Sequence, residues 1–131
     1  VGRLEEVIAG LGSKPDSWGP IHCDLGWPQN VVYQGGLACP IDFNGCALGH
    51  YLCDIAWAFA YVPAALRSDF LAGYELVYST VDEVALGAFQ VGVGMMLFAG
   101  WCTNNPSQLN RLPTFLEGPC RRFLRGEPFQ Q

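Results

Sequence analysis

The order of apolar and polar residues along this chain predicts a mainly helical protein with one small β-hairpin. Residues 4–11 carry apolar side chains at helical spacing, and Gly12 follows them as a natural helix C-cap. Residues 31–33 and 37–41 are typical of strands, and residues 34–36 between them are typical of a tight turn. We therefore expect an α+β fold in which a hairpin interrupts a series of helices.

The chain after the hairpin is expected to be helical over residues 48–125. Residues 48–62 are almost all apolar, as in a helix that is buried on every side, and Pro63 ends the run. Residues 68–78 predict an amphipathic helix.

The last third of the chain predicts one long helix and a short helical tail. Thr80-x-x-Glu83 is typical of a capping box, and it would open a helix over residues 81–102. One or two short helices are expected around residues 112–116 and 119–124.

The uncharged run of residues 84–102 is long enough to span a bilayer. A membrane hairpin with residues 48–66 would place Asp54 in the hydrocarbon, at a cost of at least about 2.5 kcal/mol. Arg67 stands alone between the two segments, so no positively charged flank sets an orientation. We expect a buried core helix here and no membrane partner.

Length and composition predict one domain over residues 1–131. Half of the residues are hydrophobic and only 15% are charged, so we expect a further lobe or a partner chain to cover surplus apolar surface. The net charge of −5 argues against a nucleic-acid partner and favours a cationic small molecule.

Six cysteines are present, but no two of them form a Cys-x-x-Cys pair. The pattern nearest to a metal cluster is Cys46-x₃-His50-x₂-Cys53. We expect most of the cysteines to be small buried side chains of a cytoplasmic protein, since thiols stay reduced there.

Three polar residues around the predicted hairpin point to phosphoryl-transfer chemistry. Folding the hairpin brings Asn30, before its first strand, close to Asp42, after its second. A carboxylate and a carboxamide suit Mg²⁺, and Asp24, in the loop upstream, can take a proton from a hydroxyl nucleophile. Taken singly, Asp24 is a turn residue, Asn30 caps a strand and Asp42 starts an Asx turn. Their joint spacing favours the catalytic interpretation.

These residues also resemble the motifs of a family. His22-x-Asp24, the downstream Asn30 and Ile41-Asp42-Phe43 are similar to the catalytic and metal-binding loops of aminoglycoside phosphotransferase and choline kinase-like enzymes, which are related in fold to protein kinases. Residues 49–56 provide a second point of resemblance.

The resemblance implies a role for each residue. In a catalytic loop over residues 21–30, Asp24 would be the base, and His22 and Asp54 would support the loop. Asn30 would bind Mg²⁺ together with Asp42, at the hairpin end of residues 41–43. ATP would be the phosphoryl donor, and the acceptor would be a hydroxyl of an amino-sugar or an amino-alcohol.

The sequence departs from the family pattern in three respects. Asn30 follows Asp24 by six residues, whereas relatives usually have five. Asn44 stands where many relatives carry a further acidic residue, which removes negative charge near the metal. The single lysine, Lys14, lies in a turn, so no strand lysine is available to pair with the phosphates.

The resemblance therefore implies the C-terminal lobe of a protein-kinase-like fold without its ATP-binding N-terminal lobe, and we expect a fragment with impaired activity. Two alternatives stay open. One is a non-catalytic remnant, or pseudokinase, that acts as an interaction module. The other is a small membrane-associated helical protein.

Overall fold

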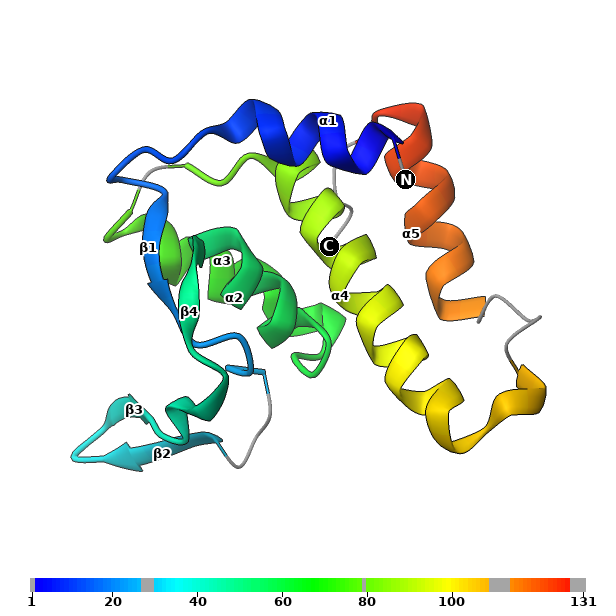
Figure 1. Ribbon diagram of the computed structural model, residues 1–131. Helices are drawn as coiled ribbons and strands as arrows, with labels where there is room; N and C mark the ends of the chain where they lie inside the picture. Colours follow the sequence, from blue (N-terminus) through cyan, green and yellow to red (C-terminus); the bar gives the residue numbers. More distant parts are fainter. Residues whose placement is uncertain (1, 27–29, 79, 109–113, 128–131) are drawn as a thin grey trace. The chain divides into compact units, whose positions relative to one another are not determined.

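A computed structural model describes residues 2–26, 30–78, 80–108 and 114–127 of the chain. It is mostly helical, with two small antiparallel sheets (Figure 1), so the predicted α+β class is confirmed. The chain divides into two compact units, one of residues 1–12 and 82–130 and the other of residues 13–81. The expectation of one domain over residues 1–131 stays a prediction.

The first unit consists of three helices and a short 3₁₀ turn: α1 (Gly2–Leu11), α4 (Glu83–Asn104), η4 (Pro106–Gln108) and α5 (Thr114–Arg125). Helix α4 packs against both α1 and α5. Its core consists of buried residues from α4 and α5 with apolar side chains of α1 around them: Ala88, Val91, Phe123, Leu4, Val7, Ile8 and Cys120. The predicted first helix is confirmed, and Gly12 ends it with a positive φ of 65°.

Helices α4 and α5 approach closely at Gly94. A Cβ atom added to Gly94 would lie 2.2 Å from the Cδ2 atom of Leu116, so any larger residue would force the buried Leu116 side chain to move. Helix α4 is also long and apolar enough to cross a membrane by length and composition alone, and a third of its apolar window is buried in the structure.

The start of α4 differs from the predicted capping box. Asp82 is the N-cap, and its carboxylate accepts hydrogen bonds from the N–H groups of Val84 (2.9 Å) and Ala85 (3.0 Å). The prediction that Thr80 opens this helix is therefore wrong. A short carboxylate directly before the helix reaches the free N–H groups of the first turn, and it also carries the charge that the helix dipole favours there.

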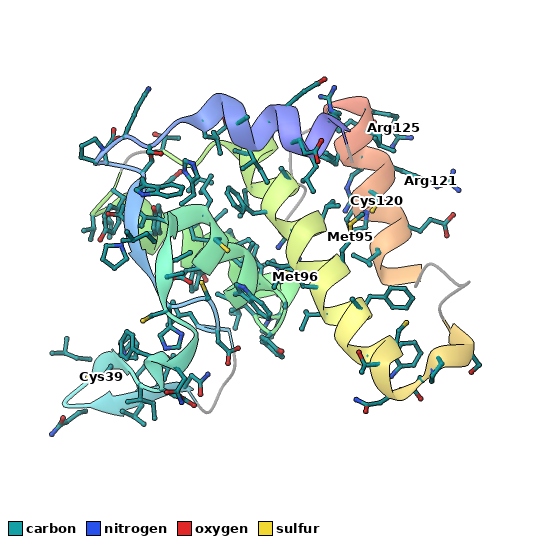
Figure 2. All side chains as sticks on the ribbon, in the orientation of Figure 1. Cys39, Met95, Met96, Cys120, Arg121 and Arg125 are labelled. Carbon is teal, nitrogen blue, oxygen red and sulfur yellow. The ribbon has the colours of Figure 1, made fainter. Side chains whose placement is uncertain are left out.

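The tail contains one helix where two short ones were expected, because α5 continues through Pro119. An interior proline costs about 3 kcal/mol. Burial of Leu116 and Phe123, on either side of Pro119, offsets that cost. On the exposed side of α5, Arg121 and Arg125 each pair with a glutamate (Figure 2). Residues 112 and 113 of the expected first tail helix lie outside the described residues.

The second unit combines two strand pairs with two helices. Its strands are β1 (Trp18–Ile21), β2 (Val31–Gln34), β3 (Leu37–Pro40) and β4 (Ala47–His50). Its helices are α2 (Tyr51–Phe59) and α3 (Arg67–Glu75), with 3₁₀ turns η2 (Phe43–Gly45) and η3 (Ala64–Leu66).

The predicted hairpin is confirmed by β2 and β3, which pair antiparallel from Val31↔Pro40 to Gln34↔Leu37. Gly35 and Gly36 form the turn with φ values of 59° and 82°, a conformation that residues with a side chain rarely adopt.

The second strand pair corrects the sequence prediction, because residues 48–50 are strand and not helix. Strand β4 pairs antiparallel with β1, from Trp18↔His50 to Ile21↔Ala47. The same ladder leads into α2, since the N–H of Tyr51 donates to the carbonyl of Ser17 (3.0 Å). Pairing with β1, which is distant in the sequence, overrides the apolar run that looked continuous with the helix.

Helix α2 forms the core of this unit through Ile55, Ala56, Ala58 and Phe59, all of them buried. Its C-terminal end is held by Arg67, whose guanidinium donates to the carbonyls of Phe59 (2.7 Å) and Val62 (3.2 Å). The same guanidinium lies over the Phe59 ring, 5.3 Å from its centroid. Helix α2 is therefore fixed at both ends, which keeps Asp54 in its first turn in place.

Candidate active site

The candidate catalytic loop follows β1 directly and is held by a carboxylate of α2. Asp54 accepts hydrogen bonds from the backbone N–H groups of His22 (Oδ2, 2.8 Å) and Cys23 (Oδ1, 2.8 Å). Each carboxylate oxygen thus accepts from one of two consecutive backbone amides. Hydrogen bonds to a charged acceptor are stronger than those between neutral groups. The loop that leads to Asp24 is tied to the start of α2 by these two contacts.

Cys23 adopts a left-handed backbone conformation, with φ of 64°. This conformation costs a residue with a side chain on the order of 1–2 kcal/mol. The two hydrogen bonds to Asp54 offset that strain. Burial, the nearby charge of Asp54 and the thiol of Cys46 raise the pKa of Cys23, so this thiol stays protonated at neutral pH.

The ring of His22 ties the same loop to the hairpin. Its Nε2 atom lies 2.8 Å from the carbonyl oxygen of Ile41, and a carbonyl only accepts, so Nε2 carries the proton. The other ring nitrogen, Nδ1, is buried and has no hydrogen-bond partner among the described residues. The ring also packs beside Phe43, with the centroids 4.7 Å apart.

Asn30 meets Asp24 directly. The Asn30 amide nitrogen donates to the Asp24 carboxylate (Oδ2, 2.9 Å) and to the Asp24 backbone carbonyl (3.2 Å). Asn30 is 6% exposed, so this contact is shielded from water. Since its nitrogen is used in this way, the Asn30 amide oxygen is the atom left to face a cation. The extra residue between Asp24 and Asn30 falls in a segment whose residues 27–29 lie outside the described residues.

Asp42 lies two residues past the last residue pair of the hairpin, Val31↔Pro40. The backbone N–H of Ile41 donates to the carbonyl of Asn30 (2.8 Å), so the residue directly before Asp42 is hydrogen-bonded to the backbone of Asn30. Asp42 is exposed and left-handed, with φ of 62°, and its Oδ1 atom accepts from the Asn44 amide (2.7 Å). The structure thus joins the side chains of Asp24 and Asn30 by a hydrogen bond and brings Asp42 to the same end of the hairpin.

The charged residues of this site do not form a dense metal cluster. No group of three or more His, Cys, Asp or Glu side chains that could hold a metal ion occurs among the described residues. The Asn30 amide oxygen and the Asp42 carboxylate are hard oxygen donors, the kind of ligand that Mg²⁺ prefers.

Two residues beside the loop, Gly26 and Tyr61, were given no role in the sequence prediction. A Cβ added to Gly26 would lie 2.0 Å from the carbonyl oxygen of Trp57 and 2.6 Å from the Cδ2 atom of Tyr61. The loop therefore runs directly against the end of α2, and only glycine fits. A sequence signal for Tyr61 did exist, because on the predicted helix it lies seven residues after Asp54 and shares its face.

The candidate site lies within a segment that matches a known family. Residues 1–88 match the family model described as the phosphotransferase enzyme family. No curated protein and no solved structure matches the chain. The matched segment contains all five residues that the sequence indicated, namely His22, Asp24, Asn30, Asp42 and Asp54.

Proposed function

This chain belongs to the phosphotransferase enzyme family, and from that premise we propose that it is the C-terminal lobe of an ATP-dependent small-molecule kinase. Within the family we place it beside the aminoglycoside phosphotransferase and choline kinase-like enzymes. The observation that carries the proposal is the hydrogen bond between Asn30 and Asp24. It lies on a loop whose backbone N–H groups donate to Asp54.

In the proposed reaction Asp24 is the general base. The Asn30 amide occupies Oδ2 of Asp24 and leaves Oδ1 as the atom that takes the proton of the acceptor hydroxyl. The acceptor oxygen then forms a bond to the γ-phosphorus of ATP, while the bond between that phosphorus and the leaving ADP oxygen breaks. Asp24 and Asn30 position the acceptor for this in-line transfer, which is where most of the rate enhancement of such enzymes arises.

The residues present fit a magnesium ion. Its ligands would be the amide oxygen of Asn30 and the carboxylate of Asp42, both of them hard oxygen donors. The hydrogen bond from Asn44 to Oδ1 of Asp42 would orient that carboxylate. When bound, the ion neutralises negative charge on the phosphates during transfer.

We propose that the rest of the ATP site belongs to a further lobe or to a partner chain. An N-terminal lobe or a partner chain would supply the phosphate-binding lysine and would cover the exposed apolar side chains of the hairpin region, namely Val32, Tyr33, Leu37, Ile41 and Phe43. We propose a cytoplasmic enzyme whose acceptor is an amino-sugar or an amino-alcohol, because the net charge of −5 favours a cationic acceptor.

A second candidate is a non-catalytic remnant that serves as an interaction module. What favours it is the exposed position of Asp42 and its hydrogen bond to Asn44, in a place where relatives carry further acidic residues. Such a remnant would keep the fold and lose the cation.

Replacement of the base tests the catalytic proposal. In the full-length protein, Asp24→Asn keeps an acceptor for the Asn30 hydrogen bond but cannot take a proton, so phosphoryl transfer from labelled ATP is expected to fall by about 100-fold or more. Asp16→Asn makes the same change at an exposed turn and is expected to leave the rate unchanged. Near-normal turnover by a folded Asp24→Asn variant would exclude this role.

A further inference from the structure

Two thiols lie where the candidate catalytic loop and the segment after the hairpin meet the end of the β1–β4 ladder. The last residue pair of that ladder is Ile21↔Ala47. Cys46 directly precedes Ala47, and Cys23 follows Ile21 by two residues. Because the two strands are antiparallel, both cysteines lie beyond the same end of the ladder.

The two segments stay in contact beyond the ladder. A Cβ atom added to Gly45, the residue directly before Cys46, would lie 3.9 Å from the Cβ atom of Cys23 and 3.6 Å from the carbonyl oxygen of His22. Cysteines joined by a disulfide have Cβ atoms about 3.5–4.5 Å apart. Cys46 is thus one residue away from a position that already meets this distance. Since residues 43–48 are exposed, a shift of this segment brings the two thiols together without rearranging the core.

The cysteines of this unit differ in how easily they react. Cys46 is exposed, Cys23 is half-buried, and both are free thiols. Burial raises the pKa of Cys23. Burial, and after it the nearby Cys23 and Asp54, raises the pKa of Cys53 to about 11. Because the thiolate is the reactive form and access to solvent is needed, Cys46 is the thiol that an oxidant reaches first.

We propose that Cys23 and Cys46 are a redox modification site at which hydrogen peroxide forms a reversible disulfide beside the candidate base. The Cys46 sulfur attacks one peroxide oxygen, and the O–O bond breaks to give a sulfenic acid and water. The Cys23 sulfur then attacks the Cys46 sulfur, and the S–O bond breaks. The hydroxide leaves as a second water with the proton of the Cys23 thiol. The two thiols lose two electrons, which reduce the peroxide, and dithiothreitol restores both thiols by exchange.

The disulfide links the residue directly before Asp24 to the segment that follows Asp42. Its effect on catalysis rests on the proposed kinase function, whereas its formation does not. A small displacement of a catalytic group lowers the rate strongly, so phosphoryl transfer by the oxidised protein is expected to fall about tenfold or more. Reduction is expected to restore it.

Peptide mapping by mass spectrometry tests whether the disulfide forms. The chain is treated with hydrogen peroxide, its remaining thiols are alkylated, and it is digested without reduction. A peptide pair linked through Cys23 and Cys46 is expected in the wild type and is expected to disappear after dithiothreitol. Cys46→Ser removes the link. Cys39→Ser is the matched control, because Cys39 lies on β3 in the hairpin (Figure 2), where its thiol donates to the carbonyl of Leu37 (3.7 Å), and this variant is expected to keep the link.

The mapping decides the site without any measurement of activity. Absence of the link in oxidised wild type, or a link from Cys46 to any other cysteine of the same or a second molecule, would overturn the inference and leave the kinase proposal intact. In the full-length protein, transfer from labelled ATP is expected to fall on oxidation of the wild type and of Cys39→Ser, and to stay within about twofold in Cys46→Ser. A linked wild type that keeps its rate overturns the effect on the base. A reduced wild type that transfers no phosphoryl group overturns the proposed function alone.

Discussion

The carboxylate of Asp54 fixes the loop on which Asp24 lies, because it accepts hydrogen bonds from the backbone N–H groups of His22 and Cys23, directly before the base. The sequence indicates Asp54 as a lone charge on an apolar helix, and burial of such a charge is costly without donors. It gives no comparable sign of the left-handed Cys23 or of the close approach of Gly26 to α2, because both depend on how the loop passes over that helix.

Replacement of Asp54 by asparagine tests this support. An asparagine keeps one oxygen acceptor but turns its NH₂ group toward the other backbone N–H, so we expect a loss of about 1–3 kcal/mol in the free energy of unfolding. Urea denaturation measures the loss, and faster hydrogen exchange at the His22 and Cys23 amides locates it.

Asp69→Asn provides the matched control, because Asp69 is likewise in the first turn of its helix but is exposed. Its loss is expected to stay below about 1 kcal/mol, the size of a helix-dipole contribution. Equal losses in the two variants would show that Asp54 acts only through the dipole and not by holding the loop.

Among the helices and strands, those with strong local signals were predicted and those that depend on distant partners were not. The two glycines of its turn predict the β2–β3 hairpin, and the spacing of its apolar residues predicts α1. Strands β1 and β4 have only four residues each. Strand β1 contains Gly and Pro, and β4 runs directly into α2. Both are strands because they pair with each other. Periodicity alone cannot separate a short apolar strand from the helix that follows it.

The start of α4 gives a test of the corrected cap. Asp82→Ala removes the side chain that accepts from Val84 and Ala85 and is expected to lower the free energy of unfolding by about 1 kcal/mol. Thr80→Ala removes the residue that the sequence pattern favoured and is expected to change stability by less than about 0.5 kcal/mol. Thermal denaturation of both variants decides which residue caps α4. A larger loss of stability in Thr80→Ala than in Asp82→Ala would restore the original prediction.

For the molecule as a whole, the residues assigned to catalysis and cation binding all belong to the unit of residues 13–81. The family match extends beyond that unit, to residue 88 within α4. The sequence could indicate which side chains carry the chemistry, because their spacing around the hairpin is local. It could not give the contact between Asn30 and Asp24, since that contact depends on how the loop and the hairpin base fold together.

The claim that Asn30 and Asp42 share a cation is tested most directly with Mn²⁺, a paramagnetic ion that takes the same oxygen ligands as Mg²⁺. In nuclear magnetic resonance spectra of this chain, Mn²⁺ is expected to broaden the backbone signals of Asp24, Asn30 and Asp42 at concentrations that leave the exposed carboxylates Asp16 and Asp69 sharp. Asp42→Asn should weaken the effect at least about tenfold. Uniform broadening of all exposed carboxylates, or broadening that Asp42→Asn leaves unchanged, would contradict the account.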